Sequence, residues 1–159
     1  MKLTINYILL IILAISLGSC SNSEDALPKN PDDTAGSPDK TDMVKVMGNV
    51  EVLKTGTFTS QSGSNTKGMM DLVKDEGGAY FVNLSNDFNS SFHTGTVTVY
   101  LSNSKELNLS EKTSYQLVAV VNEPGEHFFN LSSFPDAKFS HGILWCGAAA
   151  IPFGFAEFK

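Results

Sequence analysis

The chain has two cysteines, Cys20 and Cys146, and three histidines, and these are the side chains best suited to redox or metal chemistry. The histidines, His93, His127 and His141, do not show the close spacing of a metal-binding motif. His141 and Cys146 are five residues apart, so in a regular strand their side chains point to opposite faces. One strand therefore cannot bring both to a single metal ion. We expect loop or surface positions for the histidines, and any metal or haem stays an open question.

Cys20 follows a segment that is typical of a secretory signal. Residues 1–19 hold a single lysine, an apolar run over residues 7–17 and small residues directly before the cysteine. The run is too short for a transmembrane helix, which needs roughly 20 apolar residues. The motif Leu-Gly-Ser-Cys at 17–20 resembles a bacterial lipobox, which predicts cleavage before Cys20 and a lipid on its sulfur. The alternative is an ordinary secretory signal with an incidental cysteine.

A lipid on Cys20 makes the protein a lipoprotein of the cell envelope. A diacylglyceryl thioether with a further acyl chain such as palmitate anchors a protein stably, since each buried methylene contributes about 0.8 kcal/mol. Ser21 replaces the Asp that retains lipoproteins at the inner membrane of enteric bacteria. We therefore expect the outer membrane, with the protein on its periplasmic or surface side.

The chain after Cys20 changes character near residue 44. Residues 21–42 contain three prolines, six acidic residues and two lysines, with few apolar side chains. Such a segment cannot bury enough surface to offset its ordering entropy, so we expect a flexible acidic linker over residues 20–43. Residues 44–159 are long enough to form one domain with a hydrophobic core.

The domain over residues 44–159 is expected to be all-β. Alternating or apolar runs bounded by turn residues predict strands over 66–73, 79–84, 95–103, 114–121 and 126–131. Val97, Val99 and Leu101 share one face of their strand, and one of the adjacent Met69 and Met70 should pack inward. The polar segment before residue 114 is expected to hold one helical turn. Pro152 and Gly154 do not suit a long helix in 141–158. This spacing predicts a single antiparallel β-sandwich or barrel-like domain.

Composition excludes several classes of function. The chain has 17 acidic residues, 11 lysines and no arginine, with a formal net charge of −6, which argues against nucleic acid as a partner. It contains no phosphate-binding glycine loop and no G-x-S-x-G nucleophile motif. We therefore expect no enzymatic turnover.

Cys146 is the one remaining thiol if Cys20 carries lipid, and it lies in a compartment where disulfides form. It stands in an apolar segment beside Trp145, which favours burial as a small hydrophobic side chain. An intermolecular disulfide and a redox or ligand-binding thiol are the alternatives.

Several short motifs connect this segment to a known family. Ile143-Leu144-Trp145-Cys146 is followed by Phe153-Gly154-Phe155-Ala156, and Gly56-Thr57-Phe58, Gly68 and Tyr100-Leu101 lie upstream. Together these motifs resemble the DM thirteen domain, which accompanies haem-binding DOMON domains, over roughly residues 53–159. The supporting positions are Gly56, Phe58, Gly68, Trp145, Phe153 and Gly154. The chain departs from the family at Ser64, which stands in place of a histidine.

The resemblance implies an electron-transfer role in which the family's cysteine, here Cys146, acts as a bare thiol or holds a prosthetic group such as haem. A redox protein would then be the partner. The electron-transfer role is therefore the prediction. The alternative, which residue chemistry alone favours, is a non-catalytic binding or structural module of the envelope in which Cys146 fills the core.

Overall fold

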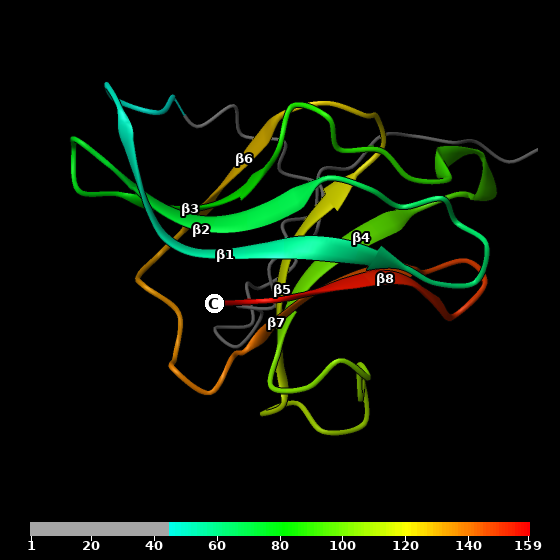
Figure 1. Ribbon diagram of the computed structural model, residues 1–159. Coiled ribbons are helices and arrows are strands. Elements are labelled where there is room, and N and C mark those ends of the chain that lie inside the picture. Colours follow the sequence, from blue (N-terminus) through cyan, green and yellow to red (C-terminus); the bar gives the residue numbers. More distant parts are fainter. Residues whose placement is uncertain (1–44) are drawn as a thin grey trace, which may run out of the picture. The chain divides into compact units, whose positions relative to one another are not determined.

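Eight antiparallel strands form one curled sheet in the computed structural model, which describes residues 45–159 (Figure 1). The strands are β1 (Val50–Ser60), β2 (Met69–Asp75), β3 (Tyr80–Leu84), β4 (Val97–Ser102), β5 (Tyr115–Val121), β6 (His127–Leu131), β7 (His141–Cys146) and β8 (Ile151–Glu157), with a 3-10 turn η1 (Phe92–Thr94) before β4. Their order is β5-β4-β7-β8-β1-β2-β3-β6. The edge strands β5 and β6 approach each other without pairing, so the sheet is a nearly closed barrel. The predicted all-β, barrel-like fold is confirmed.

β1 joins the two halves of the barrel. Its first part pairs with β2, and Phe58–Ser60 pair with β8 (Figure 1). The register shifts between Val52 and Lys54, a bulge that helps the strand to bend from one half to the other. At the crossing, a Cβ on Gly56 would lie 2.8 Å from the backbone oxygen of Glu157. This close approach of two backbones requires glycine at position 56.

The core consists of the side chains that point into the barrel. On β4 these are Val97, Val99 and Leu101, each 0% exposed, as the alternation predicts. Met70 is fully buried while Met69 is 38% exposed, so the prediction that one of the two packs inward is confirmed. The other members of the interior cluster are Phe58, Leu72, Val82, Leu84, Phe88, Val121, Leu131, Phe139, Leu144, Cys146, Phe153 and Ala156. Full burial of a large aliphatic or aromatic side chain contributes about 1.5–3 kcal/mol.

Two local predictions were wrong. The strand predicted over 66–73 begins at Met69, because Gly68 has φ +98° and breaks the extended backbone. Before it, Lys67 forms an isolated bridge with Asn89. The expected helical turn before residue 114 is a pair of tight turns, in which Glu111 N bonds to the Asn108 carbonyl at 3.2 Å and Ser114 N to the Glu111 carbonyl at 2.9 Å. β1 was not predicted as a strand, since its bulge interrupts the alternation of side chains.

Asp75 fastens the segment before β1 to the β2–β3 turn. Its Oδ2 accepts a hydrogen bond from Met47 N at 3.0 Å, and its Oδ1 accepts one from Ala79 N at 2.8 Å. The bond from Met47, aided by the turn amides, holds the pKa of this carboxyl below its ordinary value of 3.8. Asn49 adds a side-chain hydrogen bond to Glu76 at 2.8 Å. These contacts fix where the folded domain begins.

The predicted signal peptide 1–19, the predicted lipidation site Cys20 and the predicted linker 20–43 lie outside the described residues, as does the first residue assigned to the domain, Val44. Within residues 45–159, no helix has the length and apolarity needed to cross a membrane.

Candidate functional site around Cys146

Cys146 is the last residue of β7 and points into the barrel. It pairs with Val97 of β4 on one side and with Ile151 of β8 on the other. Its side chain is 0% exposed and belongs to the same buried cluster as Val97 and Val121. The prediction that the Cys146 thiol is buried is confirmed.

A tight turn covers the end of the barrel next to Cys146. The β7–β8 turn, residues 147–150, is exposed, and Ala150 takes the left-handed conformation with φ +53°. Gly147 N donates to the Thr96 carbonyl at 2.9 Å. A Cβ on Gly95 would lie 3.2 Å from the Cβ of Ala148, so the segment after η1 packs closely on this turn. The residue that carries the buried thiol is therefore followed directly by an exposed turn.

The structure does not gather the histidines around Cys146. His141 lies on the opposite face of β7, with Nδ1 2.9 Å from Ser140 Oγ. His93 is exposed on η1. Among residues 45–159, no three His, Cys, Asp or Glu side chains are grouped so that they could hold a metal ion.

His127 departs from the expected loop or surface position. It is half-buried on the barrel side of β6, where its ring stacks on Phe129 with centroids 5.7 Å apart and an interplanar angle of 4°. Phe88 meets the same ring edge-on at 6.2 Å. Nε2 lies 3.0 Å from the Glu123 carbonyl. His127 therefore lies on a strand rather than in a loop, with one face of its ring stacked on Phe129 and its Nε2 near the surface.

Trp145 and Cys146, neighbours in the C-terminal motif, lie on opposite faces of the sheet. Trp145 pairs with Thr98 and Pro152 and is half-buried on the outer side. Phe153 is the extra residue of the β-bulge opposite Trp145, and it points into the core with 2% exposure. The motif thus alternates an outer tryptophan with an inner thiol.

The remaining motif residues meet where β1 crosses β8 and the β1–β2 loop. Phe58 N donates to the Gly68 carbonyl at 3.0 Å, and its ring lies 5.8 Å from that of Phe88. A Cβ on Gly68 would lie 2.8 Å from the Phe88 Cα, and one on Gly154 would lie 2.9 Å from the Thr59 carbonyl. Glycine at positions 68 and 154 therefore allows the neighbouring backbones to pack closely.

A buried hydroxyl network beside this crossing was missed by sequence reasoning. Ser64 is 2% exposed, and its Oγ donates to the Phe153 carbonyl and lies 2.8 Å from Thr66 Oγ1. Thr66 Oγ1 in turn lies 2.8 Å from Ser90 Oγ. The one signal for it in the sequence is a run of small polar residues over 60–66. Ser64 therefore ties the β1–β2 loop to β8.

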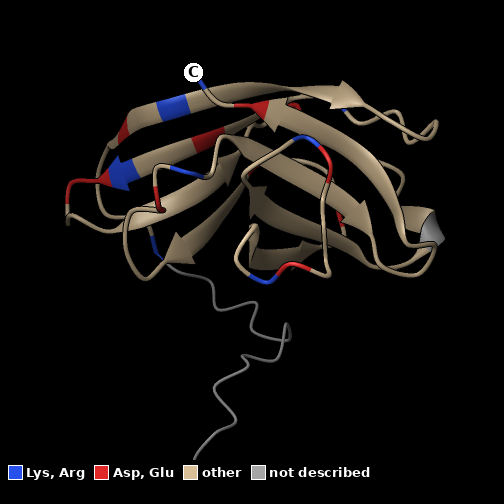
Figure 2. Cartoon of the chain, turned by 90° about the horizontal axis from the view of Figure 1, so that it is seen from below, with Lys and Arg blue, Asp and Glu red and all other residues tan. Residues whose placement is uncertain are grey.

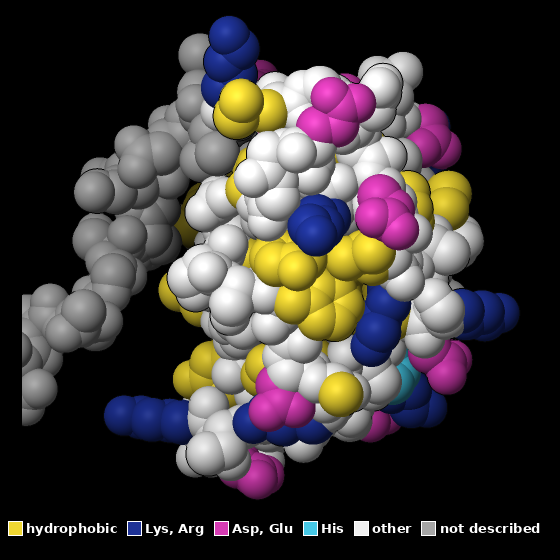
Figure 3. Space-filling view, turned by 90° about the vertical axis from the view of Figure 1, so that its left-hand side faces the viewer, with side chains coloured by type: hydrophobic (Ala, Val, Ile, Leu, Met, Phe, Trp, Pro, Cys, Tyr) yellow, Lys and Arg dark blue, Asp and Glu magenta, His cyan; other side chains and the backbone are white. Residues whose placement is uncertain are grey.

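Polar and aromatic groups elsewhere form smaller surface features. Figure 3 shows hydrophobic side chains gathered at the end of the molecule that lies to the left in Figure 1, with lysine and acidic side chains around them. At the start of β3, the ring of Tyr80 packs edge-on against Phe134 at 5.5 Å, and Lys74 Nζ lies 5.7 Å from the centre of the Tyr80 ring. Nearby, a hollow of about 410 Å³ borders the β2–β3 turn. The carboxylate of Asp75, which lines the hollow, already accepts hydrogen bonds from backbone amides. It therefore has little capacity left to bind a ligand.

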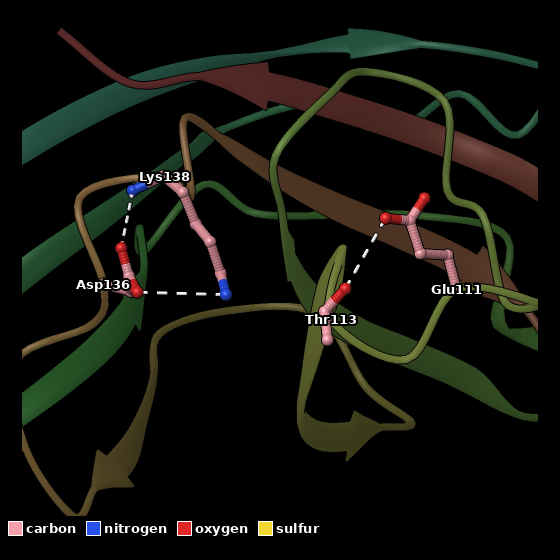
Figure 4. A network of polar contacts seen from close by, with 4 residues as sticks. All are labelled: Glu111, Thr113, Asp136 and Lys138. Atoms are coloured by element: carbon pink, nitrogen blue, oxygen red, sulfur yellow. Dashed lines mark hydrogen bonds and ion pairs between the residues drawn. The ribbon is translucent and has the colours of Figure 1, made fainter.

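Exposed loops carry a few polar contacts. Lys138 bonds to Asp136 through its backbone N at 3.0 Å and through Nζ at 3.8 Å, and Thr113 Oγ1 lies 3.5 Å from Glu111 Oε1 (Figure 4). Surface pairs of this kind contribute about 0–1 kcal/mol. They shape the loops without forming a reactive centre.

Comparison with known proteins finds no matching family model, no matching curated protein and no matching solved structure.

Proposed function

We propose that this chain is a lipid-anchored envelope protein whose β domain is a non-catalytic binding or structural module. The observation that carries the proposal is the position of Cys146, which is 0% exposed inside the barrel among aliphatic side chains. A thiol in that position acts as a small hydrophobic group.

The family motif supports the same conclusion. Gly56, Gly68 and Gly154 stand where a Cβ would strike backbone or side-chain atoms, and Phe58 and Phe153 fill the core. Their packing accounts for these residue types without reference to a reactive centre.

The anchor is proposed on the motif at 17–20, with outer-membrane placement on Ser21. The linker then tethers the domain to the bilayer and sets how far the domain can move from it.

Electron transfer through Cys146 is the second candidate, and one observation favours it. Cys146 is the last residue of β7 and directly precedes the exposed β7–β8 turn, residues 147–150, so it stands at the end of its strand rather than in the middle. The DM thirteen resemblance points to the same residue.

Fractionation and electrochemistry test the two parts separately. Cys20→Ala should move the protein from membranes to the soluble fraction, and a variant that stays membrane-bound in high salt would refute the anchor. The purified full chain should show no haem or flavin absorbance and no voltammetric wave. A wave that disappears in Cys146→Ala would establish the electron-transfer candidate instead.

A further inference from the structure

The outer surface of β4, β5, β7 and β8 is a feature that the proposed function leaves unexplained. The register places Leu117, Tyr100, Ile143 and Phe155 in one outward row. The next row contains Val120, Thr98 and Trp145. We call the outward side chains of these two rows the outer aromatic face. The alternate residues of the same strands, such as Val99 and Leu144, point into the core.

Few charges lie on the strands of this face. Glu157, at its edge opposite His141, is the one acidic or basic residue in β4, β5, β7 and β8 apart from that histidine, whereas β1 and β2 together carry Glu51, Lys54, Asp71, Lys74 and Asp75. Figure 2 shows the same division, with the charged positions on β1, β2 and the loops and long uncharged stretches on the other strands. A folded surface this poor in charge is typical of an interaction site.

The outer aromatic face combines apolar bodies with polar tips. Leu117 is 40% exposed, and Tyr100, Trp145 and Phe155 are half-buried around Ile143, which is fully buried. Burial raises the pKa of the Tyr100 phenol, with a further contribution from Tyr115, so the hydroxyl already lies in a partly desolvated setting. Tryptophan and tyrosine with such surroundings are enriched where protein meets the headgroup region of a bilayer.

We propose that the outer aromatic face docks on the headgroup region of a lipid bilayer, the membrane in which Cys20 is anchored. This inference rests on the proposed lipid anchor. The two rows themselves carry no charge, and the pair of Glu157 and His141 lies beside Phe155 at their edge, so the docking chemistry is mainly apolar and interfacial, and zwitterionic lipids suffice.

The length of chain between the anchor and the domain makes weak docking effective. Twenty-four residues, 21–44, separate Cys20 from the first described residue. They can span at most roughly 80 Å, beyond the diameter of about 35 Å expected for a domain of this size. Any face of the domain can therefore reach the bilayer. A tether of this kind keeps the local concentration near the millimolar range, so a modest affinity is enough to hold the domain down.

The chain carries its own probe for this proposal, because Trp145 is its only tryptophan and lies on the outer aromatic face. The full lipidated chain is reconstituted in phosphatidylcholine vesicles with brominated acyl chains, and Trp145 fluorescence is compared with that in unbrominated vesicles. We expect clear quenching that high salt leaves unchanged. Leu117→Glu should weaken docking roughly tenfold, about 1.4 kcal/mol. Leu109→Glu, at an exposed position in the β4–β5 loop, is the matched control and should quench like the unaltered chain.

Vesicle flotation separates the failure of docking from the failure of the anchor. Protein that floats with its Trp145 unquenched overturns docking while leaving the anchor intact. Protein that does not float refutes the anchor, and docking is then decided by adding it to excess brominated vesicles, where absence of quenching overturns the proposal. Quenching that is equal in Leu117→Glu also overturns it. The proposal is also overturned if Cys20→Ala protein self-associates in a concentration-dependent way and Leu117→Glu abolishes this association. That result would assign the face to a second copy of the chain.

Discussion

Gly142 of β7 and Met70 of β2 face each other inside the barrel, and the Met70 thioether occupies the space in which a side chain at position 142 would begin. The two strands are not neighbours in the sheet, so this contact packs one half of the barrel against the other. Met70 is fully buried, and its side chain fills the space left by the missing side chain of Gly142.

This relationship predicts non-additive stabilities. Gly142→Ala should destabilise the domain by about 1–3 kcal/mol through overpacking, and Met70→Ala by about 2–5 kcal/mol through a cavity. The double variant should lose less than the sum, because the new methyl at 142 enters the space that Met70 vacates. Urea unfolding of all four proteins measures this, and strict additivity would show that the two positions do not share that space.

The crossing of β1 and β8 gives a second prediction. Gly154→Ala should cost about 1–3 kcal/mol, since its Cβ would lie 2.9 Å from the Thr59 carbonyl, a backbone atom that cannot move aside cheaply. Gly147→Ala is the matched control, because its nearest atoms are 3.8 Å away and it lies in an exposed turn. Thermal unfolding should separate the two variants clearly. Equal melting temperatures would mean that the crossing tolerates a side chain.

The buried hydroxyl network yields a third prediction. Ser64→Ala removes the donor to the Phe153 carbonyl and a partner of Thr66 Oγ1, and it should cost about 1–3 kcal/mol. Ser110→Ala, in the exposed β4–β5 loop, should be close to neutral. Denaturant midpoints provide the comparison. A Ser64 variant as stable as its control would show that water replaces the hydroxyl without loss.

Asp75 predicts how stability depends on pH. Its pKa is lowered in the folded state by the hydrogen bond from Met47 N and the turn amides, so its contribution is fully present above the unfolded pKa of about 3.9. The contribution is lost as pH falls through the still lower folded pKa. Asp75→Asn should therefore reduce stability at neutral pH and flatten the acid limb of the stability curve. Glu106→Gln, at an exposed site, should leave that limb unchanged. An unaltered acid limb in Asp75→Asn would contradict the assignment.

The sequence predicted the elements whose side chains alternate regularly. β4 is the clearest case, because Val97, Val99 and Leu101 point into one core and no bulge interrupts their own strand. β1 escaped prediction since it changes partners between Thr57 and Phe58 and bends at its bulge, so no single period describes it.

The candidate site was predictable only in part. The burial of Cys146 follows from its apolar surroundings. What could not be read from the sequence is that Trp145 points outward into a row built from β4, β5 and β8, because that row depends on pairings between distant strands. The interior position of His127 depends in the same way on the neighbours of β6.

The reactivity of the Cys146 thiol tests the central claim most directly. The full chain in mild detergent is treated with a thiol reagent in the folded state and in denaturant, with Cys146→Ala to identify any signal from Cys20. A core position predicts labelling at least roughly a hundredfold slower in the folded state than in denaturant, equivalent to about 2.7 kcal/mol of protection. Labelling of folded protein as fast as that of denatured protein would show that the thiol is accessible and would contradict the account.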